Sequence, residues 1–240
     1  MKSVNDLSIK IFADGAEKAG MLEMHKKPYI KGFTTNPTLM RKAGISDYES
    51  FARDILTEIT DLPVSFEVFS DDFEEMRKQA LFITSWGKNV YVKIPVTNTL
   101  GAPAYGLIAD LAQAGVKLNV TAIMTMEQVR DVSAALKNDA PSIISVFAGR
   151  MADTGRDPVP FMTSARKLVS QYPFQELLWA SPRELLNIFQ ADEIGCHIIT
   201  VTNELLLKLT NVGKDLSEYS LDTVKMFRND AIKAGFSLNI

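Results

Sequence analysis

The sequence of 240 residues has one cysteine and two histidines. A single cysteine excludes a disulfide within the chain, and Cys196 lies in the apolar stretch CHIITVT, which indicates a buried, unreactive thiol. His25 and His197 are far apart, and no cysteine or histidine cluster has the spacing of metal ligands. These absences argue against zinc chemistry and against a Ser-His-Asp triad. We expect a protein that uses neither a metal nor any other cofactor.

A basic excess and long apolar runs are missing as well. The 26 lysines and arginines are balanced by 29 aspartates and glutamates, so the formal net charge is -3. Proteins that bind nucleic acid or anionic membranes generally need a basic excess to displace counterions. No run of about 18 apolar residues occurs, and the stretch MKSVNDLSIKIFADG lacks the apolar core of a signal peptide. We expect a cytoplasmic protein with no nucleic-acid or membrane partner.

What the sequence does contain is an alternation of short β-rich runs and helical patterns. Eight runs recur at spacings of roughly 20 to 35 residues, which fits one strand and one helix per repeat. An open doubly wound sheet usually has fewer strands, whereas eight such units close a parallel barrel. The pattern predicts an α/β protein, a single-domain (β/α)8 TIM barrel over residues 1–240. The expected strands are 10–14, 32–36, 64–69, 90–96, 117–123, 143–149, 176–181 and 196–202.

Between the expected strands, apolar residues recur at i, i+3, i+4 and i+7, as on the buried face of an amphipathic helix. The stretch 216–236, with Leu221, Val224 and Phe227 at helical spacing, follows the eighth unit. It predicts an additional C-terminal helix that packs on the barrel or on a neighbouring subunit. The other expected signals are a capping box of Ser46 and Glu49 before a helix at 48–59, a capping box of Thr125 and Gln128, and a helix from Gly101 to Gln113.

Lys93 lies within the strand VYVKIPVT, among β-branched and aromatic residues. On an antiparallel sheet with one solvated face, such a lysine would have an ordinary place. In a parallel barrel every strand faces helices on the outside and packed side chains on the inside, so no strand has a wet face. We therefore expect Lys93 to point into the barrel, near the carboxyl ends of the strands, where barrel enzymes place their chemistry.

Further polar residues lie in or at the ends of the expected strands. The set consists of Asp14, Asn36, Glu67, Lys93, Asn119, Thr121, Ser145 and Ser181. Those that precede a glycine or a proline, such as Asp14 and Asn36, are explained equally well as helix caps. Caps do not explain Glu67, Lys93 and Asn119 in mid-strand, where unpaired burial costs on the order of several kcal/mol. The set predicts one polar pocket.

A buried lysine ringed by carboxyl, hydroxyl and amide groups suits imine chemistry. A neutral amine attacks a ketone carbonyl, and a carboxyl or hydroxyl group moves protons through water as the carbinolamine loses water. The iminium then accepts electrons when a carbon–carbon bond breaks, without a metal. Arg150 and Arg183 follow the sixth and seventh expected strands, where barrels often bind phosphate, although a surface position would also account for each.

Seven motifs together resemble the transaldolase family, including its small fructose 6-phosphate aldolase branch: FADGA, GFTTNPTL, SFEV, VYVKIPVT, LNVTAI, ISVFAGR and WASPRE. The resemblance implies that Lys93 forms a Schiff base with a ketose and that Asp14 is the acid and base for the carbon–carbon bond. It also implies that Glu67 and Thr121 hold the water of imine formation. The residues it implies for substrate binding are Asn36, Asn119, Ser145, Phe147, Arg150, Ser181 and Arg183.

The resemblance also distinguishes transaldolases, which transfer a dihydroxyacetone unit, from aldolases, which release it. Within the family, transaldolases carry glutamate in the third strand and phenylalanine in the sixth-strand motif, where fructose 6-phosphate aldolases carry glutamine and tyrosine. Glu67 and Phe147 favour a transaldolase that moves a dihydroxyacetone unit from fructose 6-phosphate or sedoheptulose 7-phosphate to an aldose phosphate. The alternatives are a lyase that releases dihydroxyacetone and a specialised transaldolase for a modified sugar. The resemblance implies a place in the pentose phosphate pathway and a homo-oligomer, either a ring or a decamer.

Two functions of other classes fit less well. A non-catalytic barrel that binds phosphosugars would not need a lysine nucleophile together with an acid and a base. A metal-dependent aldolase would need ligands that two histidines do not provide.

Overall fold

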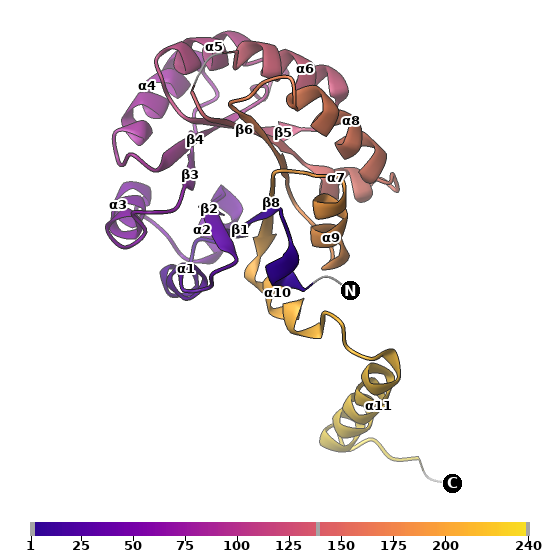
Figure 1. Ribbon diagram of the computed structural model, residues 1–240. Coiled ribbons are helices and arrows are strands. Elements are labelled where there is room, and N and C mark those ends of the chain that lie inside the picture. The colour runs from indigo at the N-terminus through magenta and orange to yellow at the C-terminus, as the bar shows by residue number, and fades with distance from the viewer. Residues whose placement is uncertain (1–2, 138–139, 239–240) are drawn as a thin grey trace.

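The computed structural model describes residues 3–137 and 140–238, in which eight parallel strands form a closed barrel (Figure 1). Each strand pairs with the next along the chain, and β8 pairs with β1. The predicted single-domain (β/α)8 TIM barrel is therefore confirmed. The strands are β1 (Lys10–Asp14), β2 (Ile30–Thr34), β3 (Val64–Glu67), β4 (Val90–Pro95), β5 (Leu118–Ile123), β6 (Ser142–Val146), β7 (Gln175–Trp179) and β8 (Ile198–Thr202).

Helices surround the barrel because each parallel strand returns to the sheet through a helical crossover. Within the described residues, no helix is long and apolar enough to cross a membrane. The helices are α1 (Lys18–His25), α2 (Pro37–Lys42), α3 (Tyr48–Glu58), α4 (Phe73–Thr84), α5 (Tyr105–Gln113), α6 (Met126–Ala135), α7 (Ala148–Ala152), α8 (Val159–Val169), α9 (Leu186–Glu193), α10 (Asn203–Leu206) and α11 (Leu216–Lys233), with 3-10 turns η1 (Val4–Asp6) and η2 (Leu207–Asn211).

The sequence predicted capping boxes at the starts of two helices, and the structure contains one of them. The capping box of Thr125 and Gln128 at the start of α6 is confirmed. The capping box predicted from Ser46 and Glu49 is wrong, because Asp47 caps α3 and accepts a hydrogen bond from the backbone N–H three residues later at 3.0 Å. A carboxylate at this position accepts the free N–H group and also interacts favourably with the helix dipole.

Several strands end earlier than their alternating patterns predict. β2 ends at Thr34, because Asn36 caps α2 and accepts from a backbone N–H of that helix at 2.9 Å. β6 ends at Val146, because Phe147 already precedes α7. The polar residues after these strands therefore belong to loops and helix starts. Their side chains reach the end of the barrel from there.

Helix α5 begins at Tyr105, four residues later than the predicted start at Gly101. The preceding residues form a tight turn in which the backbone N–H of Gly101 donates to Asn98 O at 3.0 Å. Gly101 has a φ of 79°, a left-handed conformation that only glycine adopts without strain, so the helix cannot start there.

Two apolar regions stabilise the barrel. The larger one lies between the strands and the surrounding helices. The smaller one fills the inside of the barrel and consists of Phe12, Ile143, Leu178, Ala180 and Ile198, with Tyr91 and Phe147 packed against it. The ring of Phe12 lies so close to Gly32 that a Cβ there would be 2.6 Å from it. This apolar cluster closes the middle of the barrel and leaves a hollow at each end, one at the carboxyl ends of the strands and one at their amino ends, lined by Lys10, Phe12 and Tyr91.

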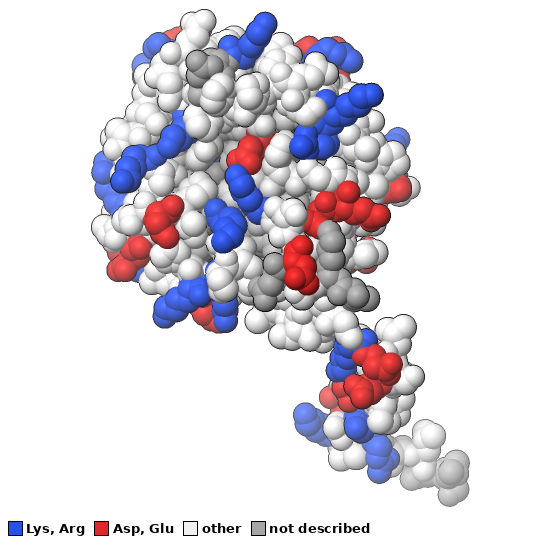
Figure 2. All heavy atoms as spheres, viewed as in Figure 1, with Lys and Arg blue, Asp and Glu red and all other residues white. Residues whose placement is uncertain are grey.

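Helix α11 extends away from the barrel, as Figure 1 shows, and the space-filling view in Figure 2 shows it standing apart from the rest of the molecule. None of its residues is buried in the single chain. Leu221, Val224 and Phe227, which share the predicted apolar face, are 53%, 60% and 63% exposed. The predicted helix is present, and its packing partner stays a prediction.

His197, just before β8, makes the stability of the barrel depend on pH. Its Nδ1 accepts a hydrogen bond from Leu177 N in β7 at 2.8 Å. Burial, and to a smaller extent the positive charge of Arg166, holds the pKa of His197 below its usual range. The unfolded chain takes up this proton at higher pH than the folded chain does, so stability falls as the pH drops through about 6.5 and below.

We expect His197→Asn to flatten the fall of melting temperature between about pH 7 and pH 5, because the amide oxygen accepts the same bond without titrating. Thermal unfolding across this range measures the effect. His25→Asn, on the surface beside Asp61, is the control. An unchanged slope in His197→Asn would contradict the assignment.

Candidate active site

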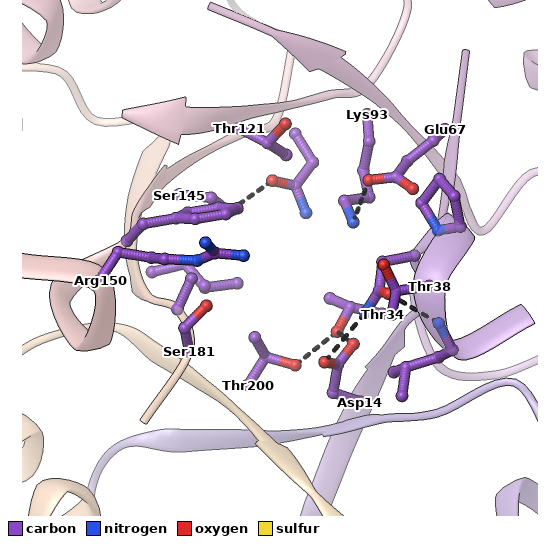
Figure 3. Close-up of a pocket in the computed structure, with 17 residues that line it drawn as sticks. Asp14, Thr34, Thr38, Glu67, Lys93, Thr121, Ser145, Arg150, Ser181 and Thr200 are labelled. Atoms are coloured by element: carbon purple, nitrogen blue, oxygen red, sulfur yellow. Dashed lines mark hydrogen bonds and ion pairs between the residues drawn. The ribbon is translucent and has the colours of Figure 1, made fainter. Parts of the chain in front are cut away.

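A pocket of about 420 Å³ lies at the carboxyl ends of the strands (Figure 3). This is the end of a parallel barrel at which barrel enzymes carry out their chemistry. All residues predicted for the site line this pocket, except Arg183. They are Asp14 in β1, Asn36 before α2, Glu67 in β3, Lys93 in β4, Asn119 and Thr121 in β5, Ser145 in β6, Phe147 and Arg150 around α7, and Ser181 after β7.

Register explains why the mid-strand residues meet. Glu67 pairs with Lys93 across β3 and β4, and Lys93 pairs with Asn119 across β4 and β5. Residues paired on neighbouring strands point to the same side of a sheet at the same height. Three polar side chains that are far apart in the sequence therefore enter the barrel next to one another.

The lysine is held by a carboxylate and a carbonyl. Lys93 Nζ lies 2.7 Å from Glu67 Oε1, with side-chain exposures of 9% and 17%, and it donates to Thr35 O at 2.5 Å. Burial raises the pKa of Glu67, and the positive charge of Lys93 opposes that rise. A proton can pass between the two side chains without further movement, which would leave a neutral amine facing the pocket.

A second carboxyl group lies across the pocket. Asp14 Oδ1 accepts from Thr34 Oγ1 at 2.7 Å, and Asp14 Oδ2 accepts from Asn36 Nδ2 at 3.3 Å. Thr34 Oγ1 is 2.5 Å from Thr200 Oγ1, so Thr200 donates to it when Thr34 donates to Asp14. Burial raises the pKa of Asp14, against the opposing charge of Lys93. Asp14 is thus oriented by two hydrogen bonds, and its burial favours the protonated form.

The floor of the pocket is a buried network of polar side chains. Ser145 Oγ donates to Asn119 Oδ1 at 2.6 Å, and Asn119 Nδ2 donates to Ser65 Oγ at 3.1 Å. These bonds fix the amide orientation of Asn119, with its oxygen towards Ser145. Hydroxyl and amide groups held in this way are suited to bind the hydroxyls of a polyol.

The rim of the pocket carries a cation and a strained loop. The Arg150 guanidinium points into the pocket in Figure 3. Ser181 has a φ of 58°, which is rare for serine. Its loop packs on α7, where Gly149 N donates to Ala180 O at 3.2 Å. A Cβ on Gly149 would lie 1.5 Å from Ser181 O, so only glycine allows this approach.

We expect Gly149→Ala to destabilise the protein by about 1 to 3 kcal/mol or more, the usual cost of overpacking. Alanine is favoured over glycine in a helix by about 1 kcal/mol, and this gain is too small to compensate for a clash with backbone. Denaturant unfolding measures the change. Gly106→Ala in α5 is the control, since its Cβ meets no atom within 4 Å. Equal stability of the two variants would contradict the expectation.

Arg183 does not line the pocket. Its Nε donates to Asp153 Oδ1 at 2.7 Å and its Nη2 bonds to the other carboxylate oxygen, Oδ2. This pairing holds the pKa of Asp153 below its usual range. A carboxylate matches the two parallel donors of a guanidinium, and Arg183 therefore ties the loop after β7 to the end of α7. Asp153 lies 30 positions before Arg183 in the sequence, so only the fold brings the two side chains together.

Three threonines in the pocket were not predicted: Thr34, Thr38 and Thr200. Threonine is common in strands, so its presence in β2 and β8 gave no signal. Strand alternation could have indicated Thr200, because Ile198, two residues earlier, lies inside the barrel. With Thr200, β8 also contributes to the site.

The chemistry available here is proton transfer and nucleophilic attack. The pocket combines an amine, two carboxyl groups of raised pKa, several hydroxyls and a guanidinium. Within residues 3–137 and 140–238, no three His, Cys, Asp or Glu side chains are grouped so that they could hold a metal ion.

Strand order and pocket together define a (β/α)8 barrel with a lysine-centred polar site. Residues 11–238 match the family model described as Transaldolase/Fructose-6-phosphate aldolase. The chain belongs to this family, and the family indicates an enzyme of the transaldolase type.

Curated relatives agree with this assignment. A probable transaldolase of Streptococcus equi subsp. zooepidemicus is 36% identical over 203 residues, 84% of this chain and 90% of that protein. A probable transaldolase of Dehalococcoides mccartyi is 34% identical over 202 residues, with the same coverage.

Solved structures show the fold at low identity. A 3-hexulose-6-phosphate synthase aligns with a TM-score of 0.57 at 14% identity, over 82% of this chain and 90% of that chain. A putative phosphonomutase from Burkholderia cenocepacia J2315 aligns with a TM-score of 0.55 at 12% identity, over 86% of this chain and 92% of that chain.

Proposed function

We propose that this protein is a transaldolase that transfers a dihydroxyacetone unit from a ketose phosphate to an aldose phosphate through a Schiff base on Lys93. The observation that carries the proposal is the buried contact of 2.7 Å between Lys93 Nζ and Glu67 Oε1, in a pocket that also contains Asp14. Family membership supports the reaction type. The proposed setting is the cytoplasmic pentose phosphate pathway.

Imine formation uses the lysine and its neighbours. Glu67 takes a proton from Lys93, and the free amine attacks the C2 carbonyl of the ketose to form a carbinolamine. Protonation of the carbinolamine hydroxyl releases water and leaves an iminium. Glu67 supplies this proton through a water molecule that Thr121, on the neighbouring wall of the pocket, helps to hold.

Carbon–carbon cleavage uses the second carboxyl group. Asp14 takes the proton of the C4 hydroxyl, the bond between C3 and C4 breaks, and its electron pair moves into the iminium to give an enamine. The aldehyde leaves as glyceraldehyde 3-phosphate when fructose 6-phosphate is the donor. The enamine attacks the carbonyl of the acceptor, Asp14 returns its proton to the new hydroxyl, and water releases the product from Lys93.

The remaining lining residues bind the substrate. Asn36, Asn119 and Ser145 line the pocket and are assigned to the dihydroxyacetone hydroxyls. Arg150 and Ser181 lie at the rim and are assigned to the phosphate, since a guanidinium binds phosphate with two parallel bonds. Arg183, paired with Asp153, supports the rim from outside the pocket.

Transfer is favoured over release because Phe147 places an apolar ring at the pocket, where a hydroxyl would orient a water molecule against the enamine.

A product assay tests whether the dihydroxyacetone unit is transferred or released. The protein is given fructose 6-phosphate with and without erythrose 4-phosphate, and glyceraldehyde 3-phosphate and dihydroxyacetone are measured.

Glyceraldehyde 3-phosphate that appears only with the acceptor is the expected result. Free dihydroxyacetone without the acceptor would show an aldolase and overturn transfer. No turnover in either mixture, together with a ketose that borohydride traps on Lys93, would retain the Schiff base and reject these sugars.

The exposed face of α11 supports a homo-oligomer. Leu221, Val224 and Phe227 leave an apolar stripe uncovered in the single chain, and a second copy of the chain would cover it. The double variant Val224→Asp with Phe227→Asp is expected to reduce the mass measured by light scattering. A native mass of one chain would exclude the oligomer.

A further inference from the structure

The backbone ladder between β2 and β3 is interrupted next to the lysine. Phe33 N donates to Pro63 O at 2.8 Å, and Thr35 N donates to Ser65 O at 3.2 Å. In a parallel pair such bonds alternate with bonds in the other direction. The next bond of the ladder would run from Glu67 N to Thr35 O.

Among the described residues, each of these two groups has a different partner. Glu67 N donates to the hydroxyl of Tyr48 at 2.6 Å, and that hydroxyl is 3.2 Å from Glu67 O. Thr35 O accepts from Lys93 Nζ at 2.5 Å. The hydroxyl thus takes the place of a backbone carbonyl, and the carbonyl is left for the ammonium group.

The ring of Tyr48 is fixed from two directions. Tyr48 is the first residue of α3, so the capped helix start sets its backbone. Its ring packs edge-on against Phe66, Phe69 and Trp86, with centroid distances of 6.1, 4.5 and 5.7 Å. Burial raises the pKa of Tyr48 well above its usual range, so the hydroxyl stays protonated at any assay pH.

We infer that Tyr48 is a positioning residue for the Lys93 and Glu67 pair, acting through its hydroxyl on the end of β3. The inference rests on the proposed function, because it concerns imine formation at Lys93. Without the hydroxyl, Glu67 N–H and Lys93 Nζ compete for the Thr35 carbonyl. The ladder then closes by one bond, Glu67 shifts towards β2, and its carboxylate loses contact with the amine.

Tyr48→Phe removes only the oxygen and keeps the ring in the cluster. We expect the rate at which borohydride traps fructose 6-phosphate on Lys93 to fall by about 10 to 100-fold, since a displacement near 1 Å costs this much. KM is expected to change less than kcat. Two charges face Glu67: Lys93, which lowers its pKa, and Asp14, which raises it. Loss of the contact with Lys93 raises the pKa of Glu67, so the acid limb of the rate profile is expected to move to higher pH.

Trp86→Phe is the matched control. It perturbs the same aromatic cluster and keeps the Tyr48 hydroxyl, and its indole Nε1 has no hydrogen-bond partner among the described residues. This variant is expected to retain the native trapping rate and pH profile. Equal slowing in both variants would assign the effect to packing and overturn the inference.

A crystal structure of Tyr48→Phe gives a result that does not depend on activity. The inference expects a bond from Glu67 N to Thr35 O and a longer distance from Lys93 Nζ to Glu67 Oε1. An unchanged pair and ladder would overturn the inference. If the native protein traps no ketose at all, the proposed function fails, while the crystal structure still decides the positioning role.

Discussion

Lys93→Met is expected to lower the rate of transfer by at least about 10³-fold, because the covalent intermediate can no longer form. Methionine has nearly the same length as lysine and fills its space. Glu67 loses its cation, and its pKa, already raised by burial, rises further. The rise favours the protonated form of Glu67, which avoids an uncompensated buried charge.

Two measurements establish the result: the coupled assay of glyceraldehyde 3-phosphate, and mass spectrometry of the protein after borohydride treatment with fructose 6-phosphate. Lys78→Met is the matched control, since Lys78 is also paired with a glutamate, at 2.6 Å, but lies on the surface with 71% of its side chain exposed. A ketose adduct in folded Lys93→Met would place the Schiff base on another lysine.

Asp14→Asn is expected to lower the rate of carbon–carbon cleavage by about 10² to 10⁴-fold, the usual contribution of a general acid and base. The amide oxygen accepts the bond from Thr34 as the carboxylate does, and only the longer bond from Asn36 Nδ2, at 3.3 Å, is lost to the amide nitrogen. Imine formation uses the Lys93 and Glu67 pair and continues. The bound ketose should therefore accumulate uncleaved on the enzyme.

The mass of the borohydride-trapped adduct separates the steps. Native protein should carry mainly the three-carbon unit, and Asp14→Asn the complete six-carbon ketose phosphate. Asp72→Asn is the control, because Asp72 caps α4 by accepting from Glu75 N at 3.0 Å and asparagine caps equally well. A three-carbon adduct formed at the native rate in Asp14→Asn would assign cleavage to another group.

The fold could be predicted because strands and helices have different periods. Each β-rich run in the sequence corresponds to one barrel strand, and the exclusion of wet faces in a parallel barrel placed Lys93 inside. The boundaries were harder. β2 and β6 end early because helix starts at Pro37 and Ala148 follow them, and a capping signal competes with strand alternation over just these residues.

The site could be predicted where a polar residue occupies a strand position that is otherwise apolar and buried. Glu67, Lys93 and Asn119 have no reason to be in buried strands other than a pocket, and the register brings them together. Thr200 was missed because threonine suits any strand. Arg183 was expected in the pocket because it follows β7, and Asp153, 30 residues earlier, holds it outside.

Sequence alone determined which elements form and which side chains face inward, because these follow from local periods of two and 3.6 residues. Tertiary structure alone decided the partners of each polar group: Thr35 O for Lys93, Tyr48 for Glu67, and Asp153 for Arg183. A hydrogen bond forms only within a narrow range of donor–acceptor distances, about half an ångström wide, and these partners are far apart in the chain. Such distances arise only when all eight strands have closed the barrel.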